Sequence, residues 1–203
     1  LHAARVGQVF TALAVITSQG AGECIRADPV APDLLSSQMN RLAREHPIAC
    51  IKTGALGSAA QVACVASFSR EVPGAALVVD PVLAASSGGD LLARGGISSM
   101  RDELLPRALV VTPNLSEAAV LASMSGCATR TEMERAARAI QQQGPAWVLI
   151  KGGHLEGDPA DLLLAPDGGC EWLEGERLVL AGTRGTGCVL ASAIAAHLAL
   201  GRE

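Results

Sequence analysis

The sequence predicts a single α/β domain built around a mostly parallel β-sheet. Short apolar segments alternate along the chain with helical segments of ten or more residues, which is the pattern of β-α-β units. No internal repeat or low-complexity linker interrupts this alternation. The 203 residues are 49% hydrophobic and 18% charged, so the chain can bury a sizeable core. We therefore expect one domain over residues 1–203.

The first half of the chain is expected to alternate strands and helices. Val9–Ile16 is apolar and partly β-branched and predicts a buried strand, which a turn-rich stretch over Thr17–Pro32 follows. Apolar residues at helical spacing predict a helix over Pro32–Arg44. By the same criteria we expect helices at Ser58–Arg70 and in the stretch that Leu104 closes, strands at Ile48–Ile51 and Ala75–Val79, and a loop at Ser86–Asp90.

The second half continues the alternation and adds a hairpin. Two short apolar segments that flank Pro-Asp-Gly-Gly predict this hairpin, with strands at Leu162–Ala165 and Cys170–Leu173. Apolar patterning further predicts strands at Ala108–Thr112 and Trp147–Ile150 and helices at Asn114–Met124, Thr131–Gln142 and Gly187–Leu200.

Polar residues stand at the ends of four predicted strands. In a doubly wound sheet, ligands bind beyond the carboxyl ends of the strands, so these residues are candidates for a site. The strand ends read Lys52-Thr53-Gly54, Asp80-Pro81-Val82, Thr112-Pro113-Asn114 and Lys151-Gly152-Gly153. Lys52 and Lys151 are the two lysines of a chain whose other basic residues are arginines, which marks them as candidates for sites that need a compact ammonium.

The glycine-rich segment GTRGTGC, residues 182–188, leads directly into the last predicted helix. Glycines let backbone N–H groups converge, and a helix N-terminus adds a partial positive charge, so Gly185, Thr186 and Gly187 can form an anion hole for a phosphoryl group. Cys188 at the helix start is expected to have a lowered pKa and to act as a base. The alternatives are an ordinary glycine-rich loop and a small buried cysteine.

Four further residues have both a functional and a structural interpretation. Asn114 and Glu117 have capping-box spacing, as do Thr131 and Glu134, but the first pair can also face a metal–nucleotide complex. Asp80 can hold Mg²⁺ through water or simply form a turn before proline. The Lys151 ammonium can meet phosphates or extend into solvent from a strand end.

Composition argues against several other classes of protein. The net charge of −4 makes a nucleic acid a poor partner, and no apolar run is long enough to cross a bilayer. The six cysteines lack the spacing of a zinc site, and a chain of this length does not need a disulfide framework. We expect mostly buried free thiols and a cytoplasmic location.

Four segments resemble the hydroxymethylpyrimidine/phosphomethylpyrimidine kinases of thiamine biosynthesis, which belong to the ribokinase-like superfamily. They read VVDPVLAASSG, VVTPNLSEA, VLIKGGH and GTGCVLASAIAAHLA, and they occur in the family's order over nearly the whole chain. The cysteine of GTGC is the specific feature, because sugar kinases of the superfamily have aspartate there. The resemblance implies a three-layer fold with helices on both faces of the sheet. It also implies ATP and Mg²⁺ as cofactors, a hydroxymethylpyrimidine substrate and a homodimer.

The resemblance also implies a role for each matching residue. Cys188 would take the proton from the substrate hydroxyl, and Gly185, Thr186 and Gly187 would form the anion hole. Further roles are ATP binding by Asn114, Lys151 and Thr183, Mg²⁺ binding by Asp80 and Glu117, and pyrimidine binding by Gln19, Val82 and Ala55.

The sequence departs from the family pattern in five places. Ala55 replaces a methionine that covers the substrate, Arg184 replaces a histidine, and Gly20 replaces an asparagine. The family's opening strand with its glycine-rich segment and the family's C-terminal tail have no counterpart between Leu1 and Glu203. Two alternatives therefore stay open: a pyridoxal or pyridoxine kinase, and an inactive ligand-binding module on the same fold.

Overall fold

The computed structural model describes residues 8–19, 24–84, 89, 91–153, 155, 158–176 and 185–202. Its main sheet has the strand order β3-β4-β5-β6-β7-β8. The strands from β3 to β6 pair in parallel, and the β6–β7 and β7–β8 pairs are antiparallel. Their bounds are Cys50–Thr53 (β3), Ala76–Val79 (β4), Val110–Val111 (β5), Trp147–Ile150 (β6), Ala160–Leu164 (β7) and Cys170–Glu174 (β8).

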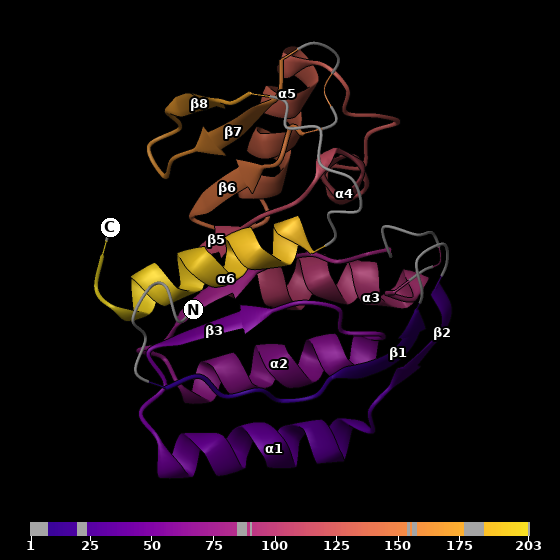
Figure 1. Cartoon of the computed structure of the whole chain (residues 1–203), viewed down its shortest axis with the longest axis vertical. Coiled ribbons are helices and arrows are strands. Elements are labelled where there is room, and N and C mark those ends of the chain that lie inside the picture. The colour runs from indigo at the N-terminus through magenta and orange to yellow at the C-terminus, as the bar shows by residue number, and fades with distance from the viewer. Residues whose placement is uncertain are drawn as a thin grey trace.

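Helices cover both faces of this sheet, because successive side chains of a strand point to opposite sides. In β4, Leu77 and Val79 join the large core with the helices of one face, whereas Val78 packs against Ala191 and Ala195 of α6 on the other. Figure 1 shows α6 in front of the sheet, and α1 and α2 at the end of the molecule away from β7 and β8. The helices are α1 (Pro32–Glu45), α2 (Ala59–Glu71), α3 (Arg94–Ser99), α4 (Leu115–Leu121), α5 (Arg130–Gln141) and α6 (Thr186–Ala199).

The predicted three-layer α/β fold is thus confirmed, and its elements lie close to the predicted positions. The β7–β8 hairpin forms around Pro-Asp-Gly-Gly, where Gly168 has a φ of 84° and the Ala165 N–H donates to the Gly169 carbonyl at 2.8 Å. After α3 the chain continues through a π-helical turn at Met100–Leu104, which agrees with the predicted helical stretch. No helix among the described residues is long and apolar enough to cross a membrane.

The prediction of a buried strand at Val9–Ile16 is wrong. Residues 8–14 are not in a strand, and β1 comprises Val15–Gln19. Ile16 is 57% exposed, since β1 pairs with β2 (Cys24–Pro29) in a separate two-stranded sheet instead of entering the main one. The same pairing contradicts the predicted turn-rich stretch over Thr17–Pro32. Charged residues such as Arg26 and Asp28 are not typical of a buried strand, and here they belong to a strand that is exposed to solvent.

The capping box of α5 lies two residues before the predicted Thr131–Glu134 pair. Thr129 is the N-cap and its hydroxyl accepts the Glu132 N–H at 3.2 Å. The Glu132 carboxylate in turn accepts the Thr129 N–H at 3.0 Å. Hydrogen bonds from the Ala128 N–H and from the hydroxyl and N–H of Thr129 hold the pKa of this carboxyl below its usual value. Both threonines are followed by glutamate three residues later, so spacing alone could not choose between them.

We expect Thr129→Ala to destabilise the protein by about 1 kcal/mol, because it removes the N-cap acceptor. The matched control is Thr131→Ala, which removes the same hydroxyl from an exposed position inside the helix and should cost well under half of that. Urea unfolding of both variants measures the difference. Equal losses would contradict the assignment of the cap.

Candidate active site

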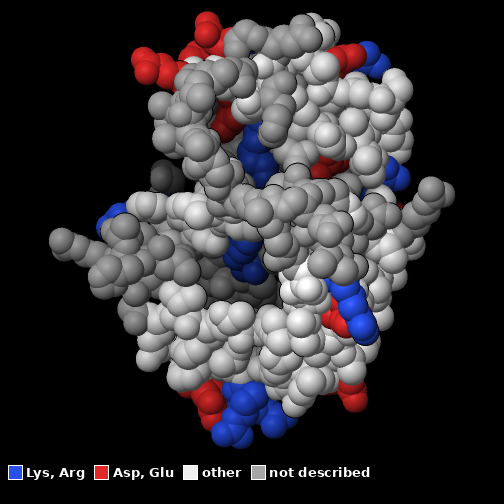
Figure 2. Space-filling view, turned by 45° about the vertical axis from the view of Figure 1, so that its right-hand side comes forward, with Lys and Arg blue, Asp and Glu red and all other residues white. Residues whose placement is uncertain are grey.

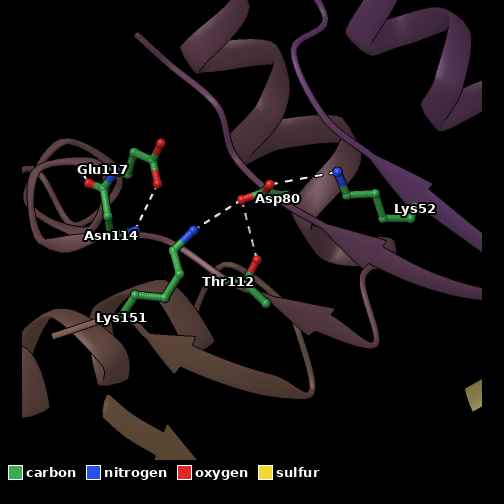
Figure 3. Close-up of polar contacts among 6 residues, drawn as sticks. All are labelled: Lys52, Asp80, Thr112, Asn114, Glu117 and Lys151. Atoms are coloured by element: carbon green, nitrogen blue, oxygen red, sulfur yellow. Dashed lines mark hydrogen bonds and ion pairs between the residues drawn. The ribbon is translucent and has the colours of Figure 1, made fainter. Parts of the chain in front are cut away.

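Asp80 is the centre of a polar cluster at the carboxyl ends of the parallel strands. Its side chain is 2% exposed and follows β4 directly. The Oδ1 atom accepts hydrogen bonds from Lys151 Nζ at 3.2 Å and from Thr112 Oγ1 at 3.5 Å. Lys52 Nζ lies 3.7 Å from Oδ2, on the other side of the carboxylate (Figure 3). One buried carboxylate thus lies between two ammonium groups.

Four neighbouring strands bring these side chains to one edge of the sheet. Lys52 belongs to β3, Asp80 follows β4, Thr112 follows β5 and Lys151 follows β6, and these strands are adjacent in this order. Pro81 and the proline after Thr112 lack the N–H that would continue the ladder, so the chain leaves the sheet there. The polar strand ends that the sequence marked as separate motifs therefore form one cluster.

Asn114 and Glu117 form a complete capping box at the start of α4. The Asn114 side chain accepts the Glu117 N–H at 2.9 Å, and Glu117 Oε2 accepts the Asn114 N–H at 2.7 Å. The structural interpretation of this pair is therefore confirmed. Glu117 is also 7% exposed, and burial raises its pKa to about 7, against the opposing effects of its backbone hydrogen bonds and of the nearby Lys151 ammonium. A cap alone does not require a buried carboxylate beside a lysine.

The N-terminus of α6 faces the same cluster. Gly185 is its N-cap with a φ of 77°, a left-handed conformation that glycine adopts without strain. A Cβ at Gly187 would lie 2.9 Å from Lys151 Nζ, so glycine permits the ammonium to approach the first helical turn. Thr186 lies between them, and the first N–H groups of a helix have no carbonyl partner within it. The predicted anion-binding residues and Lys151 therefore adjoin one another.

Cys188 is exposed and interacts with the Asp80 carboxylate, so it is not the buried cysteine of the alternative interpretation. The prediction of a lowered pKa is wrong for the thiol in this structure. Partial burial raises the pKa first, the charge of Asp80 raises it further, and the charges of Lys52 and Lys151 oppose this rise. The helix terminus that motivated the prediction is present, and the raised pKa of Cys188 comes first from the loss of solvent and then from the nearby carboxylate.

Two of the expected pyrimidine-binding residues, Ala55 and Val82, follow strands of the main sheet that also carry the cluster. Ala55 is half-buried shortly after β3, and Val82, also half-buried, comes two residues after Asp80 and donates its N–H to the Asp80 carbonyl at 2.9 Å. The backbone of Gln19 ends β1, whereas its side chain and the whole of Thr183 lie outside the described residues.

Two members of the cluster had no role in the sequence-based site. Thr112 bonds Asp80 directly, and Lys52 was marked by its strand end and by the scarcity of lysine without being given a role. Their position before or at a proline- or glycine-containing strand end was the available signal. The five cysteines whose side chains the structure describes are free, but they are less buried than predicted, since one is buried, two are half-buried and two are exposed.

The cluster lies in a concave region of the surface. Figure 2 shows basic side chains deep in a hollow near the middle of one face of the molecule. Within the described residues, no group of three or more His, Cys, Asp or Glu side chains is placed to hold a metal ion. Asp80 Oδ2 is nevertheless buried with no hydrogen-bond donor. One or two carboxylates fit Mg²⁺, which retains water and binds phosphate oxygens.

The sequence profile of the phosphomethylpyrimidine kinase family matches residues 2–203. The chain belongs to this family. It is therefore a kinase.

Curated relatives carry the same family name. The chain is 40% identical over 195 residues to the hydroxymethylpyrimidine/phosphomethylpyrimidine kinase of Streptomyces coelicolor, covering 96% of this chain and 71% of the relative. The enzyme of the same name from Rhizobium meliloti is 36% identical over 189 residues, with 93% of this chain and 71% of the relative covered.

Solved structures of two vitamin kinases share the fold. An ADP complex of Bacillus subtilis pyridoxal kinase superimposes with a TM-score of 0.86 at 29% identity, covering 95% of this chain and 73% of that one. The phosphomethylpyrimidine kinase of Clostridium difficile gives 0.78 at 26% identity, covering 96% of this chain and 79% of that one.

We expect Glu117 to make stability depend on pH. Its pKa is about 7 in the folded protein, above its ordinary value of 4.5, so its protonated form stabilises the fold fully below pH 4.5. That contribution is lost as the pH rises through about 7. Between pH 5 and pH 8 the wild type should lose on the order of 1–3 kcal/mol more unfolding free energy than Glu117→Gln.

Urea unfolding of both proteins at the two pH values, with a chelator present, tests this expectation. Glutamine keeps an oxygen that can accept the Asn114 N–H, so both proteins can form the capping box and differ only in the titrating group. Parallel pH profiles for the two proteins would contradict the raised pKa.

Proposed function

We propose that the chain transfers the γ-phosphoryl group of ATP to the hydroxymethyl group of 4-amino-5-hydroxymethyl-2-methylpyrimidine, and then phosphorylates the resulting monophosphate, in thiamine biosynthesis. One observation supports this most strongly: Asp80, both lysines and the N-terminus of α6 converge at one edge of the sheet in a member of the phosphomethylpyrimidine kinase family. Phosphoryl transfer depends mainly on positioning and on the stabilisation of negative charge, and this arrangement supplies both.

The nucleotide side of the site is proposed to lie over β5, β6 and α6. There Lys151 bonds Asp80 and adjoins Gly187, and its backbone forms a bridge with Asn114. In this proposal Lys151, Asn114 and Thr183 bind the phosphates of ATP. The N–H groups of Gly185, Thr186 and Gly187 stabilise the charge of the phosphoryl group in flight.

Asp80 and Glu117 are the proposed Mg²⁺-binding residues. Both carboxylates are buried and lie near Lys151, and Asp80 has an oxygen with no hydrogen-bond donor. Bound Mg²⁺ would supply positive charge to the phosphate oxygens. Since burial keeps Glu117 partly protonated near neutral pH, Asp80 is the stronger of the two candidates.

Cys188 is the proposed base for the hydroxymethyl oxygen. Its exposed thiol lies beside Asp80, where the proton of a bound alcohol would leave as the new P–O bond forms. The charges of Lys52 and Lys151 already act to lower its pKa. Neutralisation of Asp80 would remove one cause of the raised pKa of Cys188 and favour the thiolate.

Gln19, Val82 and Ala55 are the proposed contacts of the pyrimidine ring.

A pyridoxal or pyridoxine kinase is the second candidate. The likeness to Bacillus subtilis pyridoxal kinase favours it, because its TM-score of 0.86 exceeds the 0.78 of the Clostridium difficile phosphomethylpyrimidine kinase. Both kinds of substrate carry a hydroxymethyl group on a nitrogen-containing aromatic ring, so the strand-end cluster suits either substrate. The family match and the curated relatives favour the pyrimidine.

We also propose a homodimer located in the cytoplasm. Val9, Phe10, Leu13 and Ile16 are exposed apolar residues of one short stretch, as is common at contacts between subunits. Free cysteines are typical of a reducing compartment.

Cys188→Ala should reduce the turnover of hydroxymethylpyrimidine on the order of 10²-fold or more, because general-base catalysis contributes about that much. ATP affinity should change little. The matched control is Cys170→Ala, which removes another exposed thiol from β8. Release of ADP in a coupled assay measures turnover, and unchanged turnover in Cys188→Ala would remove this residue from the mechanism.

The wild-type chain should show a higher kcat/KM for hydroxymethylpyrimidine than for pyridoxal or pyridoxine. Turnover of the three alcohols is compared side by side at saturating MgATP. A higher kcat/KM for a pyridine alcohol would favour the second candidate over the first. If none of the three alcohols supports ADP release, both candidates are contradicted.

A further inference from the structure

Lys52 is a charged member of the site that the proposed mechanism has not used. Its side chain is 21% exposed, so its aliphatic part is mostly covered while its ammonium reaches the polar cluster. A Cβ at Gly54 would lie 3.5 Å from Lys52 Nζ, which places the ammonium over the turn that follows β3. This turn leads to Ala55, a proposed substrate contact.

The ammonium of Lys52 has hydrogen-bonding capacity to spare. Its distance of 3.7 Å from Asp80 Oδ2 permits an ion pair but exceeds the length of a hydrogen bond. That oxygen is one of the buried polar atoms with no hydrogen-bond partner in the described part of the chain. An ammonium carries three donors, so an anion could bind Lys52 without breaking a bond to Asp80.

The two lysines serve opposite sides of Asp80. Figure 3 shows Lys151 on the side of Asn114 and Glu117, and Lys52 on the other side of the carboxylate. The Lys52 charge is also close enough to Cys188 to act on its thiol. Lys151 therefore lies toward the proposed nucleotide, and Lys52 lies on the opposite side of Asp80. Both charges act on the Cys188 thiol, beside which the acceptor must place its nucleophilic oxygen.

We propose that Lys52 binds the phosphate of the acceptor in the second phosphoryl transfer and so gives the site its ability to use a monophosphate as well as an alcohol. This inference rests on the proposed function. In the second transfer an anionic acceptor approaches the anionic γ-phosphoryl group, and a fixed positive charge between them offsets the repulsion.

The two transfers make different chemical demands on the same residues. In the second, an oxygen of the acceptor monophosphate forms a bond to the γ-phosphorus, and the bond from that phosphorus to the β,γ-bridging oxygen breaks, leaving its electron pair on ADP. A phosphate monoester has a second pKa near 6, so this oxygen is already deprotonated at neutral pH and needs no base. An alcohol does need one. Cys188 therefore serves mainly the first transfer and Lys52 mainly the second.

The test compares kcat/KM for hydroxymethylpyrimidine and for its monophosphate in the same preparation, so that the ratio is independent of the folded fraction. Lys52→Met should lower the value for the monophosphate at least tenfold more than the value for the alcohol, as expected for the loss of a charge-assisted contact. Lys52→Gln is a second neutral variant, and Lys52→Arg keeps the charge and should preserve most of the ratio.

Two matched variants complete the comparison. Lys151→Met removes the other lysine and should lower both values by similar factors, because both transfers use ATP. Cys188→Ala should shift the ratio in the opposite direction to Lys52→Met. Isothermal titration gives a readout without turnover: the monophosphate should bind Lys52→Met about tenfold or more weakly than the wild type, with little change for the alcohol.

Equal losses for the two acceptors in both neutral Lys52 variants would show that Lys52 is only a counter-charge of Asp80 and would overturn the inference. An unchanged value for the monophosphate would overturn it as well. If the wild type phosphorylates the alcohol but not the monophosphate, the second transfer and the role of Lys52 fail while the first transfer stands. If it phosphorylates neither, the proposed function fails too.

Discussion

The burial of the Asp80 carboxylate governs the arrangement of the site. An ionised carboxylate that is 2% exposed is tolerated only where charges and donors compensate the lost water. Lys151, Lys52 and Thr112 provide this compensation from three other strands. The compensation of the Asp80 charge therefore requires that the four strand ends be aligned. Removal of any one partner leaves the buried carboxylate with fewer compensating groups.

The sequence revealed those features of the fold that depend on local pattern. Buried strands such as Trp147–Ile150 and the Pro-Asp-Gly-Gly hairpin carry their own signals, and their predicted positions agree with the structure. The β1–β2 ribbon does not carry such a signal, because its strands are largely exposed and β2 contains the charged residues Arg26 and Asp28. The cap of α5 was misplaced since Thr129 and Thr131 have the same spacing to a glutamate, and only hydrogen bonds distinguish them.

The candidate site was predictable residue by residue but not as a set of interactions. Strand ends and glycines pointed to Asp80, Lys151 and the start of α6, and the structure brings these together. The raised pKa of Cys188 could not be predicted from the sequence, because it depends first on the burial of the thiol and then on a carboxylate more than a hundred positions away in the chain. For the same reason, the contacts of Thr112 and Lys52 with Asp80 became evident only from the order of the strands in the sheet.

The scarcity of lysine in this chain has a practical consequence. Side-chain primary amines occur at two positions, and both ammonium groups lie within 4 Å of the same carboxylate. Reductive methylation with isotopically labelled formaldehyde would therefore place spectroscopic reporters on opposite sides of the candidate active site, with no background from other side chains. Few proteins of this size offer so selective a view of ligand occupancy without any engineered change to the sequence.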